Sequence, residues 1–272
     1  MAKVWFVTGS SRGFGREFVE AALSRGDKVA ATARDVGAVA DLVEAHGDAV
    51  FAQALDVTDR AAVHAAVKAA HERFGRLDVI VNNAGYGLFG MVEELTEQQV
   101  RDQFETNFFG AFSVTQAVLP ILRAQQSGHI VQISTIGGIA AFPSLGGYHA
   151  SKWALEGLTE SLAQEVAAFG IKVTLVEPGS FATDWAGSSA AHAAPIDAYQ
   201  PMRDAMRARR GQAKPGDPKA AGKALLEVVD AEEPPLRVLF GAMPTQIVKK
   251  LYADRLLTWA EWEKLSISAD GI

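Results

Sequence analysis

Cysteine is missing from this 272-residue sequence, and its absence narrows the possible chemistry. Disulfide bonds, thiolate catalysis and cysteine-ligated metal sites are all excluded. The six histidines are scattered along the chain, and none stands at a metal-binding spacing from an Asp or a Glu. No metal site is therefore expected.

Long basic runs and long apolar runs are missing as well. The formal net charge is −6, and no run of Lys or Arg is longer than the pair Arg209–Arg210. This argues against nucleic acids or anionic membranes as partners. No apolar stretch approaches the roughly 18 residues of a membrane-spanning helix. The start of the chain, Met1–Thr8, is typical of a short strand rather than a signal peptide. We therefore expect a cytoplasmic protein without a membrane segment.

What the sequence does contain is a regular alternation of strand and helix patterns. Short apolar runs rich in β-branched residues alternate with helical patterns, which is typical of βαβ units. With 49% hydrophobic and 21% charged residues, the chain suits one α/β domain over residues 1–272. The prediction is a doubly wound, mostly parallel sheet of about seven strands with helices on both faces. The predicted strands are Lys3–Thr8, Lys28–Ala33, Ala49–Ala54, Leu77–Val81, His129–Ile133, Lys172–Val176 and Leu236–Phe240.

The helices between these strands are predicted from capping residues and apolar periodicity. Thr58 is the expected N-cap of a helix that runs to about Phe74. Thr96, with Gln99 three residues later, predicts a capping box. Further helices are expected at Asp35–His46, Gly110–Gln126, where Pro120 could introduce a kink, and Tyr148–Phe169.

Two C-terminal segments depart from the alternation. The stretch from about Ala186 to Pro218 is rich in Ala, Ser, Gly, Pro and Arg and shows no strand pattern. A long irregular segment in a compact domain is usually functional or mobile, so residues 183–218 are expected to form a lid over a substrate. The tail, about 243–265, is expected to be helical and carries Trp259 and Trp262.

Three glycines follow the first predicted strand directly. Gly9, Gly13 and Gly15 lie between that strand and a helical pattern that runs to about Arg25. Glycine lets the backbone approach a ligand closely, and the N-terminus of a helix attracts phosphate. A tight turn without a ligand is the alternative, but a strand before and a helix after favour a bound dinucleotide.

The end of the second strand bears on which dinucleotide would bind. An NAD site places an acidic residue at this position, where it holds the ribose hydroxyls. Here Ala33 is followed by Arg34, and Arg12 lies within the glycine turn. Two guanidinium groups favour a 2′-phosphate, so NADP(H) is predicted and NAD(H) stays possible. Asp35 is expected to cap the next helix instead.

Tyr148 and Lys152 lie four residues apart in a predicted helix, so they should share one face. A nearby cation favours the phenolate and lowers the pKa of a tyrosine. Such a tyrosine can exchange a proton with an alcohol or ketone oxygen. The same spacing also occurs on ordinary half-exposed helix faces, so the pair alone does not establish chemistry.

Together these motifs resemble the short-chain dehydrogenase/reductase family, whose members have a single-domain Rossmann fold. The resemblance covers roughly the first two-thirds of the chain, and only the combination of motifs is specific. The matching motifs are Thr8–Gly15, Asp56-Val57, Asn82–Gly85, Asn107, Ser134, Tyr148 with Lys152, and Pro178-Gly179.

The resemblance implies roles for individual residues. Asp56 and Val57 match the pair that contacts adenine, and Thr183 matches a threonine that contacts the nicotinamide carboxamide. The catalytic residues implied are Asn107, Ser134, Tyr148 and Lys152. The expected cofactor-binding residues are Gly9, Ser11, Arg12, Gly13, Phe14, Gly15, Arg34, Asp56, Val57, Asn83, Ala84, Gly85, Tyr148, Lys152, Pro178, Gly179, Phe181 and Thr183.

The family's chemistry implies a hydride transfer between NADP(H) and a hydrophobic ketone or secondary alcohol. The substrate oxygen would lie between Ser134 Oγ and Tyr148 Oη, and Tyr148 would be the general acid or base. Lys152 would lower the Tyr148 pKa, and Asn107 would hold a water that replenishes the proton. Such enzymes are usually homodimers or homotetramers built through the two long helices.

Two other readings stay open. The chain could be an inactive NADP(H)-sensing or scaffold module on the same fold, although such relatives usually lack the Tyr or the Lys. An epimerase or dehydratase acting on a sugar nucleotide fits less well, because the glycine spacing differs and a longer C-terminal domain is missing. Substrate, direction and oligomeric state cannot be derived from the sequence.

Overall fold

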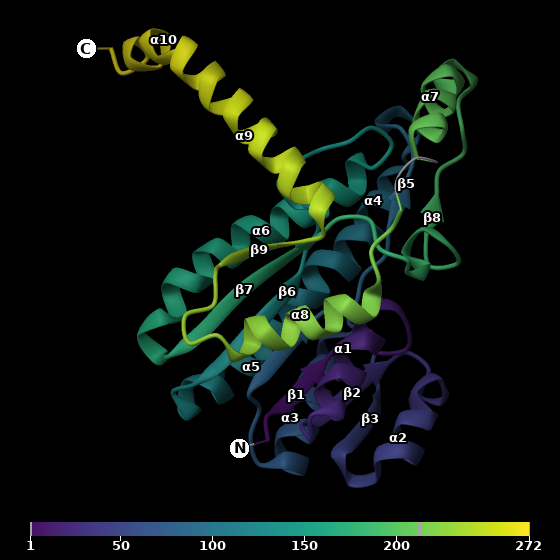
Figure 1. Ribbon diagram of the computed structural model, residues 1–272, viewed down its shortest axis with the longest axis vertical. Coiled ribbons are helices and arrows are strands. Elements are labelled where there is room, and N and C mark those ends of the chain that lie inside the picture. The colour runs from purple at the N-terminus through teal and green to yellow at the C-terminus, as the bar shows by residue number, and fades with distance from the viewer. Residues whose placement is uncertain (1, 211–213, 272) are drawn as a thin grey trace.

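Seven parallel strands form the central sheet of the computed structural model, which describes residues 2–210 and 214–271 (Figure 1). Their order is β3-β2-β1-β4-β6-β7-β9, and every pairing is parallel. The predicted α/β fold with about seven strands is therefore confirmed. The strands are β1 Val4–Val7, β2 Lys28–Ala33, β3 Val50–Ala54, β4 Val79–Asn82, β6 Gly128–Ile133, β7 Ile171–Pro178 and β9 Arg237–Phe240.

Helices cover both faces of this sheet because successive strand residues point to opposite sides. In β1, Trp5 and Val7 belong to a core beneath α1 and α8, whereas Val4 and Phe6 belong to a second core beneath α3, α5 and α6. The strand order reverses at β1, between β2 and β4, which is where ligands bind in such sheets. The helices are α1 Gly13–Ser24, α2 Ala40–His46, α3 Arg60–Phe74, α4 Glu97–Phe104, α5 Ala111–Gln125, α6 Gly146–Val166, α7 Gln200–Arg210, α8 Pro218–Asp230, α9 Ala242–Glu261 and α10 Glu263–Ser268.

Several helix starts differ from the predictions. The predicted N-cap at Thr58 is wrong, because Asp59 accepts a hydrogen bond from Ala62 N at 3.0 Å and α3 begins one residue later. Thr58 instead donates to the Asp56 carboxylate. The capping box of Thr96 and Gln99 at the start of α4 is confirmed.

One predicted helix begins with a different turn in the structure, and another is found as predicted but preceded by a further helical segment. The segment expected at Asp35–His46 begins with the 3₁₀ turn η1, Val36–Val39, before α2. The long helix expected at Gly110–Gln126 starts from a π-helical segment, η4, Glu105–Gly110. A π turn adds one residue and redirects the side chains that follow it, and such turns are frequent at functional sites.

The expected irregular segment contains more structure than its sequence suggests. The absence of a strand there was a wrong prediction, because β8, Ala191–His192, pairs in parallel with β5, Leu88–Phe89. The short turns η7, Asp184–Ala186, and η8, Asp197–Tyr199, frame β8, and α7 follows. Within the expected lid, residues 211–213 lie outside the described residues.

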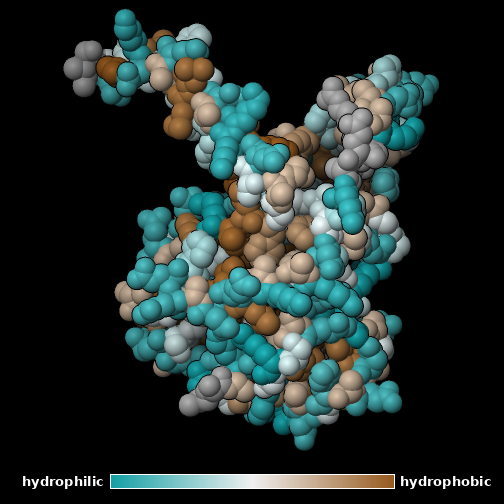
Figure 2. Space-filling model, in the orientation of Figure 1, coloured by the Kyte–Doolittle hydropathy of each residue, from teal (hydrophilic) through white to brown (hydrophobic). Residues whose placement is uncertain are grey.

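The last two helices, α9 and α10, project from the body as an arm (Figure 1). Figure 2 shows hydrophobic side chains among hydrophilic ones along this arm. Among the described residues, no helix has both the length and the apolar character needed to cross a bilayer. Six large apolar side chains of the arm are each between 59% and 64% exposed: Leu256, Leu257, Trp259, Trp262, Leu265 and Ile267.

Candidate active site

The glycine turn at the end of β1 can only be built from small residues. Gly9 and Gly13 have φ values of +69° and +58°, a region that favours glycine. A Cβ on Gly15 would lie 2.2 Å from the Gly9 carbonyl oxygen and 2.5 Å from Asn83 Nδ2. The first turn of α1 contains no acidic residue, and Arg12 at its N-cap makes no side-chain capping bond. The backbone N–H groups there suit an anionic ligand such as a pyrophosphate.

The loop after β4 holds this turn in place. Asn83 Nδ2 donates to the carbonyl oxygens of Thr8 and Gly9 at 2.9 and 3.1 Å. In return, Thr8 Oγ1 accepts from the backbone N–H groups of Asn83 and Ala84, each at 3.0 Å. Asn83 and Thr8 thus satisfy backbone polar groups at the start of the turn and in the loop after β4. The N–H groups in the first turn of α1 take no part in these hydrogen bonds and could bind a cofactor.

The residues expected around the adenosine half of the cofactor lie in three places: beyond β2, after β3, and in the glycine turn. Arg34 is exposed just beyond β2, and Asp35 accepts a hydrogen bond from Gly37 N at 2.9 Å, so Asp35 caps the turn as predicted. Asp56 is exposed and its carboxylate accepts from Thr58, whereas Val57 packs into the second core. Arg12 lies 3.2 Å from the Asp184 carboxylate of η7, so this guanidinium joins the glycine turn to the segment after β7.

Tyr148 and Lys152 lie on the buried face of α6, and only 6% and 5% of their surfaces are exposed. Lys152 Nζ donates to the Ile133 carbonyl oxygen at 2.8 Å. Burial lowers the pKa of Lys152 to about 8, although the Glu156 carboxylate acts in the opposite direction. Burial also raises the pKa of Tyr148 above its ordinary value. The expected lowering of the Tyr148 pKa by Lys152 is therefore not seen in this arrangement.

The structure brings Thr135, not Ser134, to the tyrosine. A hydrogen bond with the Thr135 side chain lowers the pKa of Tyr148, against the larger effect of burial. Thr135 also caps the turn η5, Ile136–Gly138, and donates to the Pro178 carbonyl oxygen at 3.4 Å. The Ser134 hydroxyl lies on the other side, toward Glu156, whose pKa it lowers, yet its Oγ lacks the geometry of a hydrogen bond. The expected place of Ser134 beside the substrate oxygen does not fit these contacts.

Asn107 is 1% exposed and is held by its neighbours from both ends of its amide. Its Oδ1 accepts from Tyr86 N at 3.1 Å, and its Nδ2 donates to Tyr86 O at 3.1 Å and to Ser151 Oγ at 3.3 Å. A Cβ on Gly85 would lie 3.0 Å from Asn107 Oδ1 and 3.7 Å from Lys152 Nζ. The π turn η4 thus places Asn107 beside the same glycine that Lys152 approaches.

The segment after β7 packs against the glycine turn and the first turn of α9. The Phe181 ring packs edge-on against Phe14, with 5.0 Å between centroids, and Thr183 lies within 3.6 Å of where a Cβ on Gly13 would be. Gly179 packs against Pro244 in the first turn of α9, because a Cβ there would lie 2.6 Å from Pro244 Cγ. Thr183, expected at the nicotinamide carboxamide, thus lies beside the glycine turn, whereas Gly179 contacts α9.

Trp185 of η7 lies directly against Tyr148. Its ring centroid is 4.9 Å from that of Tyr148 and 5.2 Å from that of Phe89 on β5. A large apolar side chain in this position fills space next to the phenol, so a substrate must displace it or pack against it.

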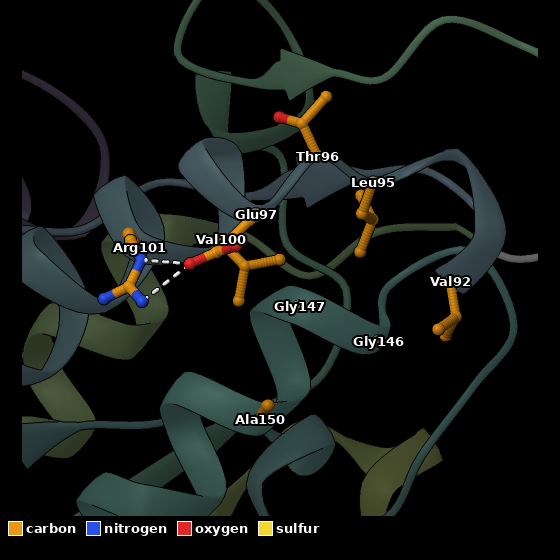
Figure 3. Close-up of a pocket in the computed structure, with 9 residues that line it drawn as sticks. All are labelled: Val92, Leu95, Thr96, Glu97, Val100, Arg101, Gly146, Gly147 and Ala150. Carbon is orange, nitrogen blue, oxygen red and sulfur yellow. Dashed lines mark hydrogen bonds and ion pairs between the residues drawn. The ribbon is translucent and has the colours of Figure 1, made fainter.

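Two cavities flank this centre without being lined by Tyr148 or Lys152. One, of about 540 Å³, lies between α4 and the start of α6, and an ion pair between Glu97 and Arg101 borders it (Figure 3). The other, of about 450 Å³, lies between α7 and the β5–β8 pair and is lined in part by Phe89, His192 and Arg203. Arg203 is paired with the buried Glu94, so it is neither a solvated basic residue nor a free anion site.

Comparison with known proteins gives a consistent assignment. The family model described as "short chain dehydrogenase" matches residues 3–194. An oxidoreductase of Botryotinia fuckeliana is 43% identical over 99% of this chain and all of its own length. A 3-ketodihydrosphingosine reductase of Bacteroides thetaiotaomicron is 35% identical, over 89% of this chain and 88% of its own.

The solved structures agree with these sequence matches. The crystal structure of a short-chain dehydrogenase from Streptomyces avermitilis superposes with a TM-score of 0.93, at 41% identity and with 98% of each chain covered. A relative from Burkholderia phymatum in complex with NAD has a TM-score of 0.82, at 29% identity, and covers 94% of this chain and 95% of its own. One from Burkholderia cenocepacia in complex with NADP has a TM-score of 0.76, at 27% identity, over 96% and 97%. Both cofactors therefore occur among similar structures.

Proposed function

The chain belongs to the short-chain dehydrogenase/reductase family and is an NAD(P)-dependent oxidoreductase, and we propose that it transfers a hydride between NADP(H) and a hydrophobic ketone or secondary alcohol. One observation carries this proposal. The buried Tyr148, Lys152 and Asn107 and the half-buried Thr135 lie at the carboxyl ends of the strands, on the side of the sheet where the glycine turn leads into α1.

The preference for NADP(H) rests on charge at the end of β2. Asp35, the one acidic candidate for the ribose hydroxyls there, is engaged in capping η1. Arg34 is exposed next to it, and Arg12 extends from the glycine turn. A guanidinium group pairs with a phosphate in bidentate geometry, so these two residues favour a 2′-phosphate.

The reaction follows from the side chains that surround Tyr148. The nicotinamide supplies or accepts the hydride when it is bound. As negative charge develops on the ketone oxygen, the Thr135 hydroxyl stabilises it and the Tyr148 phenol donates its proton. Lys152 supports the phenolate that remains, and Asn107, fixed by Tyr86, holds the path by which a water returns the proton. In the oxidative direction the same groups remove a proton from the alcohol.

The substrate class follows from the walls of the site. Trp185 and Phe89 line the approach to Tyr148, and Ile139 and Phe142 belong to the loop before α6. Aromatic and aliphatic walls suit an apolar carbonyl compound. The reductase from Bacteroides thetaiotaomicron carries a 3-ketodihydrosphingosine in its name, which makes long-chain ketones a reasonable first group to test.

The proposed function predicts NADPH consumption with hydrophobic ketones. A panel of aliphatic, aromatic and steroid-like ketones and aldehydes should be measured with NADPH and with NADH at equal concentrations. We expect turnover on apolar ketones and a kcat/KM at least about tenfold higher with NADPH, because a bidentate arginine–phosphate pair is a strong charge-assisted interaction and about 1.4 kcal/mol corresponds to a factor of ten. Tight binding of NADPH without turnover on any compound would favour the inactive sensing module instead.

The site geometry predicts that substituting Tyr148 or Thr135 lowers kcat much more than substituting Ser134, the residue next to Thr135. Tyr148→Phe should lower kcat by about 10²- to 10⁴-fold, because it removes the general acid. Thr135→Val, which keeps the shape of the side chain, should lower kcat by about 10²-fold. Ser134→Ala, the matched control, should keep kcat within about threefold of wild type. The reverse order, with Ser134→Ala more damaging than Thr135→Val, would restore Ser134 as the residue that binds the substrate oxygen.

We also propose that the segment 183–218 is a lid that closes over the substrate. The Arg12–Asp184 ion pair that ties it to the glycine turn is partly exposed, so it is weak and can open. Hydrogen exchange of the η7 and β8 amides should therefore slow when NADPH and a substrate analogue bind, whereas the amides of α3 should not change. Equal exchange of η7 and β8 with and without ligands would argue against a lid.

We propose that the chain forms a homodimer or homotetramer and that the arm takes part in it. Apolar side chains are exposed near the start of α5, where Phe109 lies, and on α6, where Trp153 lies, as well as on the arm. Arg255 fixes the base of the arm to the body by donating to the Ile139 carbonyl oxygen at 2.9 Å. The exposed tryptophans beyond it are residue types that dominate interface energy.

The arm's part in assembly can be tested by removing its aromatic side chains. The double variant Trp259→Ala/Trp262→Ala should raise the dissociation constant of the oligomer by at least about tenfold, because buried interface tryptophans typically contribute about 2 kcal/mol or more each. Light scattering after size exclusion, over a range of concentrations, measures this. Lys249→Ala/Lys250→Ala on the same helix is the control, and an unchanged mass for both variants would remove the arm from the interface.

A further inference from the structure

Two buried carboxyl groups lie behind Lys152 and have no part in the reaction described above. Glu156 follows Lys152 by one turn of α6 and is 4% exposed, and Glu177 lies on β7 and is 2% exposed. Carboxylates at this degree of burial are destabilising unless they are paired or protonated. Glu156 also acts on the charge of the buried Lys152, so the two carboxyl groups call for an electrostatic explanation.

One guanidinium group faces both carboxyl groups. Arg237 Nε on β9 lies 3.1 Å from Glu156 Oε2 and 3.5 Å from Glu177 Oε1. Its Nη2 also pairs with Glu160, at the more exposed end of the cluster, at 3.0 Å. The buried oxygens Glu156 Oε1 and Glu177 Oε1 make no hydrogen bond among the described residues. One positive charge is thus shared among three carboxyl groups, two of them buried.

Two carboxyl groups that share one site cannot both ionise easily, so one of them holds a proton. Burial, together with the nearby Glu156 carboxylate, raises the pKa of Glu177 to about 8, against the effect of Arg237. Burial also raises the pKa of Glu156, but Ser134, Arg237 and Lys152 all act in the opposite direction. Arg237 Nε lies closer to Glu156 than to Glu177, and Lys152 faces only Glu156, so the arrangement favours Glu177 as the protonated member of the pair and Glu156 as the charged one.

The pair is connected to the reactive centre through Lys152. The Glu156 carboxylate raises the pKa of Lys152, against the effect of burial. The fold makes room for this contact at Gly138, where a Cβ would lie 2.5 Å from Ser134 Oγ and 2.8 Å from Glu156 Oε1. Because Lys152 supports the Tyr148 phenolate, its protonation state bears on the reaction.

We propose that Glu156 and Glu177 form a pair that holds one proton and one negative charge behind Lys152 and thereby keeps the lysine charged during turnover. Both are positioning residues, since neither reaches the substrate. The proposal rests on the proposed hydride transfer for its effect on rate, but the pair itself is a property of the cofactor-free chain. The charged groups that face the pair are Lys152 and Glu160 from α6 and Arg237 from β9, with the Ser134 hydroxyl at the end of β6.

The shared proton can be observed without cofactor or substrate. Infrared difference spectra of the cofactor-free protein, recorded as a pH titration, should show the carbonyl band of a protonated carboxylic acid at neutral pH. This band should disappear as the pH rises through about 8. Glu177→Gln should remove the band, and Glu160→Gln, the matched control, should keep it. A wild-type spectrum without this band at neutral pH would overturn the proposal, as would a band that persists in Glu177→Gln.

The effect on Lys152 is measured by the pH dependence of ketone reduction. Glu156→Gln removes the charge facing the lysine, so the alkaline limb of the kcat profile should move down by about one pH unit, since an opposite charge nearby shifts a pKa by roughly one to three units. Glu177→Gln keeps that charge and should move the limb by less than half as much, and Glu160→Gln should not move it. A limb that stays in place in Glu156→Gln, with activity lowered evenly at all pH values, would reduce the pair to a structural role.

Failure of the proposed function and failure of the proposed carboxyl pair would give different experimental results. If the wild-type chain reduces no ketone at all, the proposed function is wrong, and the infrared titration alone decides whether the pair exists. If ketones are reduced and the infrared band is absent, the proposed function stands and the one-proton pair is wrong.

Discussion

The buried ammonium group of Lys152 is the constraint around which the rest of the site is arranged. A cation with 5% exposure must be hydrogen-bonded and balanced by negative charge, or it will release its proton. The Ile133 carbonyl oxygen accepts one hydrogen bond from it, at 2.8 Å, and Glu156 supplies the nearest negative charge. The sheet edge, the start of α6 and the β9 arginine therefore form one electrostatic unit, although they lie far apart in the sequence.

A second constraint, steric this time, operates at the other end of the cofactor site. Asn83 bridges the carbonyl oxygens of Thr8 and Gly9, and the helix start at Gly15 passes so close to the Gly9 carbonyl oxygen and to Asn83 Nδ2 that no Cβ fits. The side chain that fixes the turn also fills the space behind it, so the open side of the turn faces only the ligand. Arg12 then links this turn to Asp184, which connects the phosphate end of the site with the segment that carries Trp185.

The sequence was sufficient for the sheet and for the position of the glycine turn, because both depend on local patterns. Runs such as Val4–Val7 are apolar on both faces, and glycines at a strand end restrict the ligand to one place. The choice between Ser134 and Thr135 could not be made in this way. Neighbouring residues of an extended segment point to opposite sides, so one of these two side chains faces Glu156 and the other faces Tyr148. Ser134 and Thr135 both carry a hydroxyl group, so residue type does not show which of them faces the tyrosine. The N-cap of α3 failed for the same reason, since Thr58 and Asp59 are both good caps.

The pKa values of the site could not be predicted from spacing either, because burial outweighs the charge pair. Spacing alone predicts that Lys152 lowers the Tyr148 pKa, yet the lysine is directed at Ile133 and burial raises that pKa. In the proposed reduction a phenolate forms on Tyr148, and it needs a cation beside it at that moment. Lys152, one turn further along α6, is the cation on the same buried face. The Glu156 carboxylate favours the charged form of this lysine, against the effect of burial. The buried glutamates thus serve one requirement of the proposed reaction, a lysine that is still charged when the phenolate forms.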